Sequence, residues 1–171
     1  AATAQWLNHM GKSEAYPEQK YAARQYLLHA NQALREDIPG IYPTAWPIDR
    51  FEQSFGLHAL LLAGCLFHPK LADVVSKQLL SLKSAFTPTG IGFSEHFETD
   101  GDDSFAAASV LISGGYEVNS SLFQYFQRDH QFTSYPYELQ SSPSVTARAV
   151  HALTLAGGDA HRSLDYLLRS Q

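Results

Sequence analysis

The sequence contains almost no cysteine. Cys65 is the only one among 171 residues, and it lies in the apolar stretch LLLAGCLF. A single thiol excludes an intramolecular disulfide framework and a zinc site built from several cysteines. Such cysteine usage is typical of a reducing compartment, so we expect a cytoplasmic protein.

Basic clusters and long apolar runs are also missing. Lysine and arginine form no run and the formal net charge is −5, so we expect no nucleic-acid partner. The longest apolar run, LHALLLAGCLF, is too short to span a bilayer, so we expect neither a signal peptide nor an integral membrane segment in this sequence. The eight histidines form neither an H-x-x-x-H pair nor an H-E-x-x-H motif, so we expect no metal site in this chain.

Strand patterns are weak, whereas helical periodicity runs through almost the whole chain. Hydrophobic residues make up 44% of the sequence, which is enough for one domain with a sizeable core. Prolines stand where helices should begin and glycine pairs where they should end. The pattern predicts an all-α protein with helices over residues 1–10, 17–34, 48–67, 70–84, 103–114, 119–128, 143–157 and 159–170.

Short and long connections alternate between these helices. This alternation predicts stacked helical hairpins, as in an αα-solenoid or an αα-barrel. The three long loops, 34–47, 85–102 and 129–142, are rich in proline, glycine and aromatic residues. Each follows an expected outer helix and precedes an inner one, so we expect all three at the same end of the fold. Loops gathered on one end of a rigid scaffold are a usual place for a functional site.

One of these loops ends in HFETDGDDSFAAASVL, where Asp100, Asp102 and Asp103 crowd against the start of an apolar helix. Helix capping explains one acid, because an N-terminal carboxylate satisfies free N–H groups and the helix dipole. It does not explain three, because like charges this close raise one another's cost of ionisation.

Two metal-binding interpretations of this cluster fail on position. A calcium-binding EF-hand loop would need glycine and glutamate where Phe105 and Leu111 stand. A magnesium-diphosphate motif of the DDxxD kind would need aspartate where Ala106 stands.

Acid catalysis is the remaining interpretation beside capping. Neighbouring carboxylates and apolar surroundings raise one pKa, so that one aspartate keeps its proton while the others orient it. Such an acid could protonate an alkene, and aromatic faces could stabilise the resulting carbocation. The long loops supply candidates for those faces: Trp46, Phe93, Phe97, Tyr135 and Tyr137.

Three histidines have two interpretations each. His96 lies four residues before Asp100 and could hydrogen-bond the acids, or it could be a solvated loop residue. His58 and His151 lie on apolar helices, where packing histidines are the favoured interpretation over ligands.

The cluster D-G-D-D-S resembles the D-x-D-D-T/S motif of class II terpene cyclases. Its flanks, among them GIGFSEHFETDGDDSFAAASVLISGGYEV and SYPYELQSSPS, are similar to the segment around that motif in labdane-type diterpene cyclases of bacteria or fungi. Upstream, IPGIYPTAWPIDRFEQSFGLHALLLAG resembles the family's YP…FE segment, and the opening AATAQWL resembles its SPsATAawL segment. The resemblance covers nearly the whole chain, in the family's order.

This resemblance implies a terpenoid cyclase toroid with two αα-barrel domains, β and γ, and an active site between them. Residues 1–40 would form the end of the inserted γ domain and a connector, and residues 41–171 the central part of the β domain. The substrate implied is an isoprenoid diphosphate, geranylgeranyl diphosphate. The implied partners of the fragment are the remaining parts of γ and β. Magnesium is implied as well, with ligands outside this chain, so we expect the fragment alone to be inactive.

The resemblance also assigns roles to the acids. Asp102, the middle acid, would protonate the terminal alkene, while Asp100 and Asp103 would set its orientation and acidity. Ring closure and deprotonation would then give a copalyl-type bicyclic diphosphate.

Departures from the family leave other interpretations open. Some plant members carry P-N-V, with the asparagine holding a deprotonating water, where this chain has Pro39, Gly40 and Ile41. That base is therefore absent. The repeated Q-x-x-x-x-G-x-W segments of triterpene cyclases do not occur, which favours the diterpene side. The alternatives are the same chemistry on farnesyl diphosphate or a triterpene precursor, or a non-catalytic αα-barrel that binds a prenyl group or a partner protein.

Overall fold

The computed structural model describes residues 2–11, 13–33 and 47–170. The chain divides into two compact units, Ala1–Pro47 and Ile48–Gln171. The expected domain boundary at residues 40 and 41 lies outside the described residues. Assigning the two units to γ and β stays a prediction.

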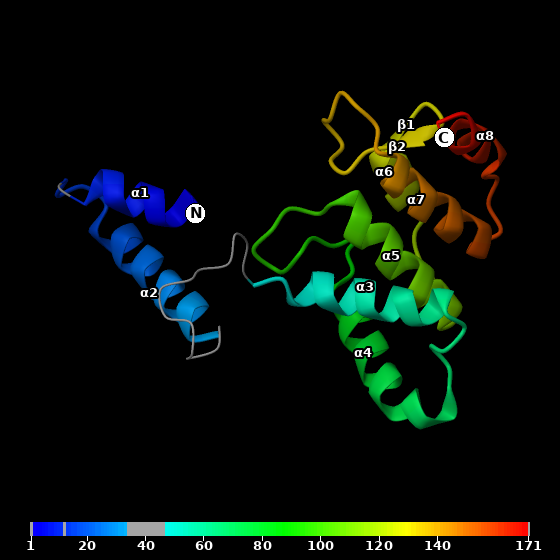
Figure 1. Cartoon of the computed structure of the whole chain (residues 1–171), viewed down its shortest axis with the longest axis horizontal. Helices are drawn as coiled ribbons and strands as arrows, with labels where there is room; N and C mark the ends of the chain where they lie inside the picture. Colours follow the sequence, from blue (N-terminus) through cyan, green and yellow to red (C-terminus); the bar gives the residue numbers. More distant parts are fainter. Residues whose placement is uncertain (1, 12, 34–46, 171) are drawn as a thin grey trace. The chain divides into compact units, whose positions relative to one another are not determined.

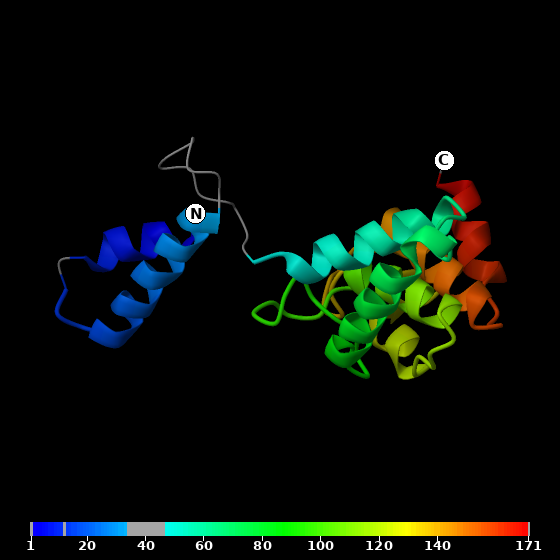
Figure 2. The same ribbon diagram turned by 90° about the horizontal axis from the view of Figure 1, so that it is seen from below.

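The first unit is a pair of helices, α1 (Ala2–Met10) and α2 (Pro17–Ala33), which contact each other (Figure 2). Tyr16, in the turn between them, has a φ of 59°. Pro17 follows as the first residue of α2, where its fixed φ suits a helix start.

The second unit is built on three helices, α3 (Asp49–Leu62), α5 (Gly101–Ser113) and α7 (Pro143–Leu155). The α5 helix lies between the other two and contacts both (Figure 1). It can occupy this place because its sequence is small and apolar on all sides, and most of its residues are buried.

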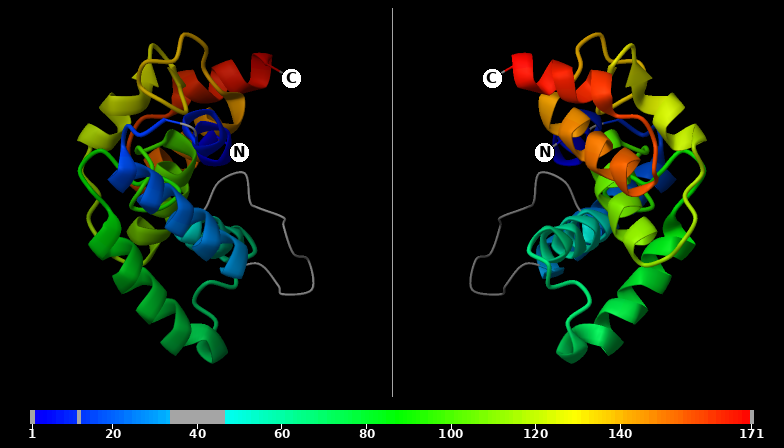
Figure 3. Two further views of the ribbon diagram at one scale, coloured as in Figure 1. Left: turned by 90° about the vertical axis from the view of Figure 1, so that its left-hand side faces the viewer. Right: turned by 90° about the vertical axis from the view of Figure 1, so that its right-hand side faces the viewer.

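The partner helices of the second unit complete three hairpins. They are α4 (Ala72–Ala85), which follows a 3₁₀ turn at Pro69–Leu71, α6 (Ser121–Phe126) and α8 (His161–Arg169). The α7 and α8 helices contact each other and lie side by side in Figure 3, in orange and red. The prediction of an all-α fold made of helical hairpins is confirmed.

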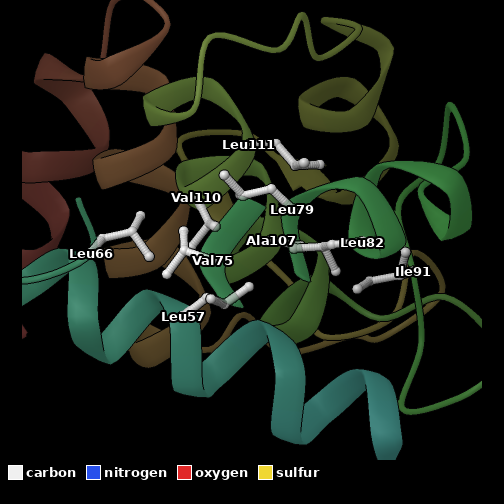
Figure 4. Packing of buried hydrophobic residues seen from close by; sticks show 9 residues of the cluster. All are labelled: Leu57, Leu66, Val75, Leu79, Leu82, Ile91, Ala107, Val110 and Leu111. Carbon is white, nitrogen blue, oxygen red and sulfur yellow. The ribbon is translucent and has the colours of Figure 1, made fainter. Parts of the chain in front are cut away.

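Two hydrophobic clusters hold this unit together. The first lies between α3, α4 and α5 and is shown in Figure 4; it consists of Leu57, Leu66, Val75, Leu79, Leu82, Ile91, Ala107, Val110 and Leu111. The second is centred on Phe105, whose ring centroid lies 5.6 Å from that of Phe123 and 5.2 Å from that of Phe132. Both clusters contain residues of α5, so they fix this helix and the loop before it.

Two predicted helices are shorter in the structure by four residues or more. The helix expected over 48–67 ends at Leu62, because Gly64 adopts a φ of +68° and turns the chain so that Leu66 is buried. The helix expected over 119–128 covers only Ser121–Phe126.

A two-stranded hairpin follows α6, and the sequence did not indicate it. It pairs β1 (Gln127–Arg128) with β2 (Gln131–Phe132) in antiparallel fashion. Strands of two residues are too short to show an alternating pattern. No helix within the described ranges is long and apolar enough to cross a membrane.

Candidate active site

The three acids gather where α5 begins. Asp100 is the N-cap residue, and its Oδ1 accepts a hydrogen bond of 2.9 Å from the backbone N–H of Asp103. Asp102 and Asp103 stand in the first turn of the helix. Capping therefore accounts for Asp100, as one interpretation of the sequence predicted, and leaves the other two acids unexplained.

Gly101 brings this helix start close to the loop after β2. Its N–H donates to the carbonyl oxygen of Ser134 at 2.8 Å, and a Cβ atom at this position would lie 2.5 Å from the carbonyl oxygen of Thr133. On the other side, the N–H of Asp100 donates to the carbonyl oxygen of Ile91 at 3.0 Å. The loops 85–102 and 129–142 thus meet at the acids, as expected. Most of the third loop, 34–47, lies outside the described residues.

Asp100 and Asp103 are buried, with 2% and 0% of their surface exposed. The Ser54 hydroxyl donates to Asp103 Oδ1 at 2.8 Å, but the Oδ2 atoms of both acids have no hydrogen-bond partner within the described part of the chain. A buried carboxylate without partners is costly, so protonation is favoured.

The pKa values of this pair follow from the burial. Desolvation, and next the neighbouring charge of Asp103, raise the pKa of Asp100 to about 8. Desolvation also raises the pKa of Asp103, partly offset by its hydrogen bonds with Ser54 and Asp100. The pair therefore holds at least one proton near neutral pH.

Asp102 differs from its two neighbours because it is accessible, with 29% of its side chain exposed. Arg148 Nη1 on α7 donates to Asp102 Oδ1 at 2.7 Å, and the Ser134 hydroxyl donates to Oδ2 at 3.3 Å. The Arg148 guanidinium also lies 4.8 Å from the ring centroid of Phe55 on α3. Among the three acids, only Asp102 can touch a molecule outside the helix packing.

Arg148 was missed in the sequence reasoning. It is the only charged residue of the α7 sequence PSVTARAVHALTL, apart from a histidine. A single arginine on an inner apolar helix indicates a buried or half-buried anionic partner, and this signal could have identified it.

Four of the five expected aromatic residues form two groups. Phe93 lies between Phe51 and Phe97, at ring-centroid distances of 5.8 and 5.6 Å. Tyr135 and Tyr137 stack at 5.8 Å.

The two tyrosines differ in their surroundings. Desolvation and the nearby Asp100 raise the pKa of Tyr135, which places this side chain within electrostatic reach of the acids. Tyr137 is exposed, and its hydroxyl donates to Glu98 Oε2 at 2.9 Å. Trp46 lies outside the described residues.

Of the two interpretations of His96, the hydrogen bond to the acids is not formed in this structure. The His96 side chain is 63% exposed, and its Nε2 lies 3.6 Å from Glu95 Oε1. The solvated interpretation fits its position, because the residue stands in a turn in which its backbone N–H donates to the Ser94 hydroxyl.

His58 and His151 meet between α3 and α7. His58 Nε2 and His151 Nδ1 are 3.1 Å apart, so one ring donates a hydrogen bond to the other. Desolvation, followed by the charges of His151 and Arg148, lowers the pKa of His58 to about 4. Both rings border a pocket of about 370 Å³ lined by His58, Leu62, Ser144, Ala147, Arg148 and His151. The sequence predicted packing residues and gave no sign of their contact.

A metal ion does not fit this arrangement. Across residues 2–11, 13–33 and 47–170, no group of three His, Cys, Asp or Glu side chains could hold one. The Mg²⁺ that the resemblance implies would need ligands from outside these residues.

The site therefore combines a buried acid pair that retains a proton, an accessible carboxyl group beside a guanidinium, and aromatic side chains nearby. Such an arrangement is suited to holding and transferring a proton.

Sequence comparison places the chain among terpenoid enzymes, although no protein-family model matches it. It is 48% identical over 162 residues to (+)-kolavenyl diphosphate synthase of Herpetosiphon aurantiacus. The aligned segment covers 95% of this chain and 31% of that protein. It is 32% identical over 121 residues to phyllocladan-16-alpha-ol synthase of Phomopsis amygdali, covering 67% of this chain and 12% of that protein.

Solved structures share the fold. The ent-copalyl diphosphate synthase of Streptomyces platensis matches 87% of this chain and 29% of its own, with a TM-score of 0.69 and 25% identity. Abietadiene synthase of Abies grandis matches 99% of this chain and 22% of its own, with a TM-score of 0.75 and 17% identity, which is evidence for the fold alone.

The chain spans about a third or less of the length of each of these relatives. The matches to (+)-kolavenyl diphosphate synthase and to abietadiene synthase cover nearly all of this chain, at 95% and 99%. The helical hairpins around α5, predicted from the sequence, are present in the structure. The chain belongs to the class II diterpene cyclases of the copalyl diphosphate synthase-like type, of which it forms a segment.

Proposed function

We propose that the protein containing this chain cyclises geranylgeranyl diphosphate to a copalyl-type bicyclic diphosphate, and that Asp102 supplies the initiating proton. The observation that carries this proposal is the contrast among the three acids. Asp100 and Asp103 are buried and favour their protonated forms, whereas the carboxyl group of Asp102 is accessible. A general acid must reach the atom that it protonates, and Asp102 alone meets this requirement.

The proposed reaction moves one proton in and one out. The Asp102 O–H proton adds to one carbon of the terminal alkene, whose π electrons form the new C–H bond and leave a tertiary cation. Two neighbouring double bonds then attack in turn to close two rings. Loss of a proton beside the final cation forms the product alkene, and the diphosphate remains attached. Phe93 and Tyr135 would offer ring faces to the cationic intermediates.

Arg148 has a defined place in this scheme. The ion pair at 2.7 Å supports a role in stabilising the carboxylate left on Asp102 after its proton has gone. A group that must protonate a weak base is a more effective donor when the anion that it leaves behind is stabilised. Once Asp102 has given up its proton, its negative charge contributes to raising the pKa of both Asp100 and Asp103, so the proton stored next to it is retained.

Incubation of the full-length protein with C15, C20 and C30 isoprenoid substrates, followed by product analysis, tests the proposal. We expect a bicyclic diphosphate from the C20 substrate. We expect Asp102→Asn to lower its rate of formation by a factor of about 10²–10⁴, the usual contribution of a general acid, with substrate binding unchanged.

Asp129→Asn is the matched control. Asp129 is exposed in the β1–β2 turn with a φ of 55°, a conformation that asparagine also tolerates, so cyclisation should be unaffected. A normal rate in Asp102→Asn would refute the acid assignment. Binding without any product from the wild-type protein would favour a prenyl-binding module.

A further inference from the structure

A polar strip runs from the acids along the facing sides of α3 and α7. On α7, Ser144, Arg148 and His151 stand at positions i, i+4 and i+7, which share one helix face. On α3, Ser54 and His58 are four residues apart. Ser54 and Arg148 bind the acids, so the histidines lie one turn further along the same two faces.

The histidine pair always presents one free lone pair. If the Nε2–H of His58 donates to Nδ1 of His151, the lone pair is on His58 Nδ1. If the Nδ1–H of His151 donates instead, the lone pair is on His151 Nε2. Either tautomer can accept one proton, and the added charge is then shared across the hydrogen bond.

The surroundings of His58 disfavour its charged form. His58 is 6% exposed, and the Arg148 cation stands beside both rings as part of the same pocket lining. Burial and the adjacent cation both disfavour a protonated imidazole. A weak but neutral base is sufficient for a carbocation, because a C–H bond beside a cationic carbon is strongly acidic.

The position of the pair suits a compact cyclic intermediate. Arg148 contacts Asp102 and, three residues further along α7, His151 borders a pocket of about 370 Å³. Three residues correspond to about 4.5 Å of helix rise. Arg148 therefore contacts the acid with its guanidinium and lines the same pocket as the histidines, so we expect a fused bicyclic cation to reach both.

We infer that the His58–His151 pair is the base that removes the final proton in the proposed cyclisation. This inference rests on the proposed function and supplies the base that is left unassigned by glycine at position 40. In this step a C–H bond next to the cation breaks, and its electron pair forms the product C=C bond and neutralises the cation. The proton goes to the free ring nitrogen of the pair.

The test uses the full-length protein with geranylgeranyl diphosphate and compares wild type with His58→Phe, His151→Phe and His151→Gln. The variants retain the acid, so we expect substrate consumption within a few-fold of wild type. The copalyl-type share of the products should fall by about tenfold or more, a lower bound for loss of a general base. Water-captured alcohols and alkene isomers should replace it, because the cation persists until another acceptor arrives.

Two controls separate this role from a structural one. His151→Gln keeps a hydrogen-bonding side chain without a basic nitrogen, so a folded variant with altered products supports the base. His130→Gln changes an exposed histidine of the hairpin and should leave products unchanged.

Wild-type product shares in a folded His151→Gln protein would overturn the inference. A parallel loss of substrate consumption and of product, without by-products, would also overturn the inference, because that result indicates a packing role. Absence of any cyclic product from the wild-type protein would instead refute the proposed function.

Discussion

The residue that distinguishes this site is Asp100 as much as Asp102. Helix capping alone would leave Asp100 ionised, because its Oδ1 accepts a backbone N–H. Its Oδ2 atom is nevertheless buried without a partner, and Asp103 repeats this feature one turn into the helix. The two buried acids therefore contribute a stored proton, and stability depends on that proton.

We expect the free energy of unfolding to fall as the pH rises from about 4 to about 8 because of Asp100. The pKa of Asp100 is about 8 in the folded protein against an ordinary value of 3.8, so the folded state binds a proton that the unfolded state has released. The contribution is at most about 1.4 kcal/mol per pH unit.

Urea unfolding at pH 5 and pH 8 measures this effect. The loss of stability between the two pH values should be smaller in Asp100→Asn than in wild type, and unchanged in the exposed Asp129→Asn. Identical pH dependence in wild type and Asp100→Asn would contradict the assignment.

Among the elements, α5 determines the site because its first turn is held from three directions. Ile91 precedes it in the same loop, Thr133 and Ser134 border its first residue, and Ser54 of α3 reaches Asp103. The acids can be buried at this helix start only because Gly101 has no side chain. The packing of the start of α5 therefore determines the geometry of the site.

We expect Gly101→Ala to destabilise the protein by about 1–3 kcal/mol, the usual effect of overpacking. Its Cβ atom would lie 2.5 Å from the carbonyl oxygen of Thr133 and 2.8 Å from Val145 Cγ1, so the helix start would have to move. Gly56→Ala is the control, since nothing lies within 4 Å of its Cβ position in α3. This control should stabilise by about 0.5–1 kcal/mol. Denaturant unfolding that ranks the two variants in the opposite order would contradict this account.

The sequence predicted the elements better than their contacts. Helix starts and ends at Pro17, Pro143 and Gly114 were correct because proline and glycine restrict the backbone locally. The contacts of Arg148 with Asp102 and of His58 with His151 join residues 46 and 93 positions apart. No local pattern encodes such pairs, and they become visible only when α3, α5 and α7 are packed together.

On the scale of the whole molecule, the chain contains the proposed acid and corresponds to part of a cyclase. Its matches cover 31% of (+)-kolavenyl diphosphate synthase and 29% of ent-copalyl diphosphate synthase. Within the described ranges, no group of acids suits the Mg²⁺ that a diphosphate substrate would bring. We expect the rest of the full-length protein to hold the diphosphate and to enclose the carbocation.

We expect the 171-residue chain alone to form no cyclic product from geranylgeranyl diphosphate, while the full-length protein does. The helical fold should persist in the fragment, because residues 48–170 contain two hydrophobic clusters of their own. Circular dichroism checks the helices and product analysis checks turnover. Product formation by the folded fragment would show that the remaining sequence is dispensable.

Deuterium transfer from solvent tests the central claim most directly. The full-length protein is equilibrated in D₂O and given geranylgeranyl diphosphate, and the product is analysed by mass spectrometry and NMR. If Asp102 is the donor, the bicyclic diphosphate carries solvent deuterium at the carbon derived from the terminal alkene, and Asp102→Asn forms this labelled product about 10²–10⁴ times more slowly. A cyclic product without deuterium, or labelled product formed by Asp102→Asn at the wild-type rate, would contradict protonation by Asp102.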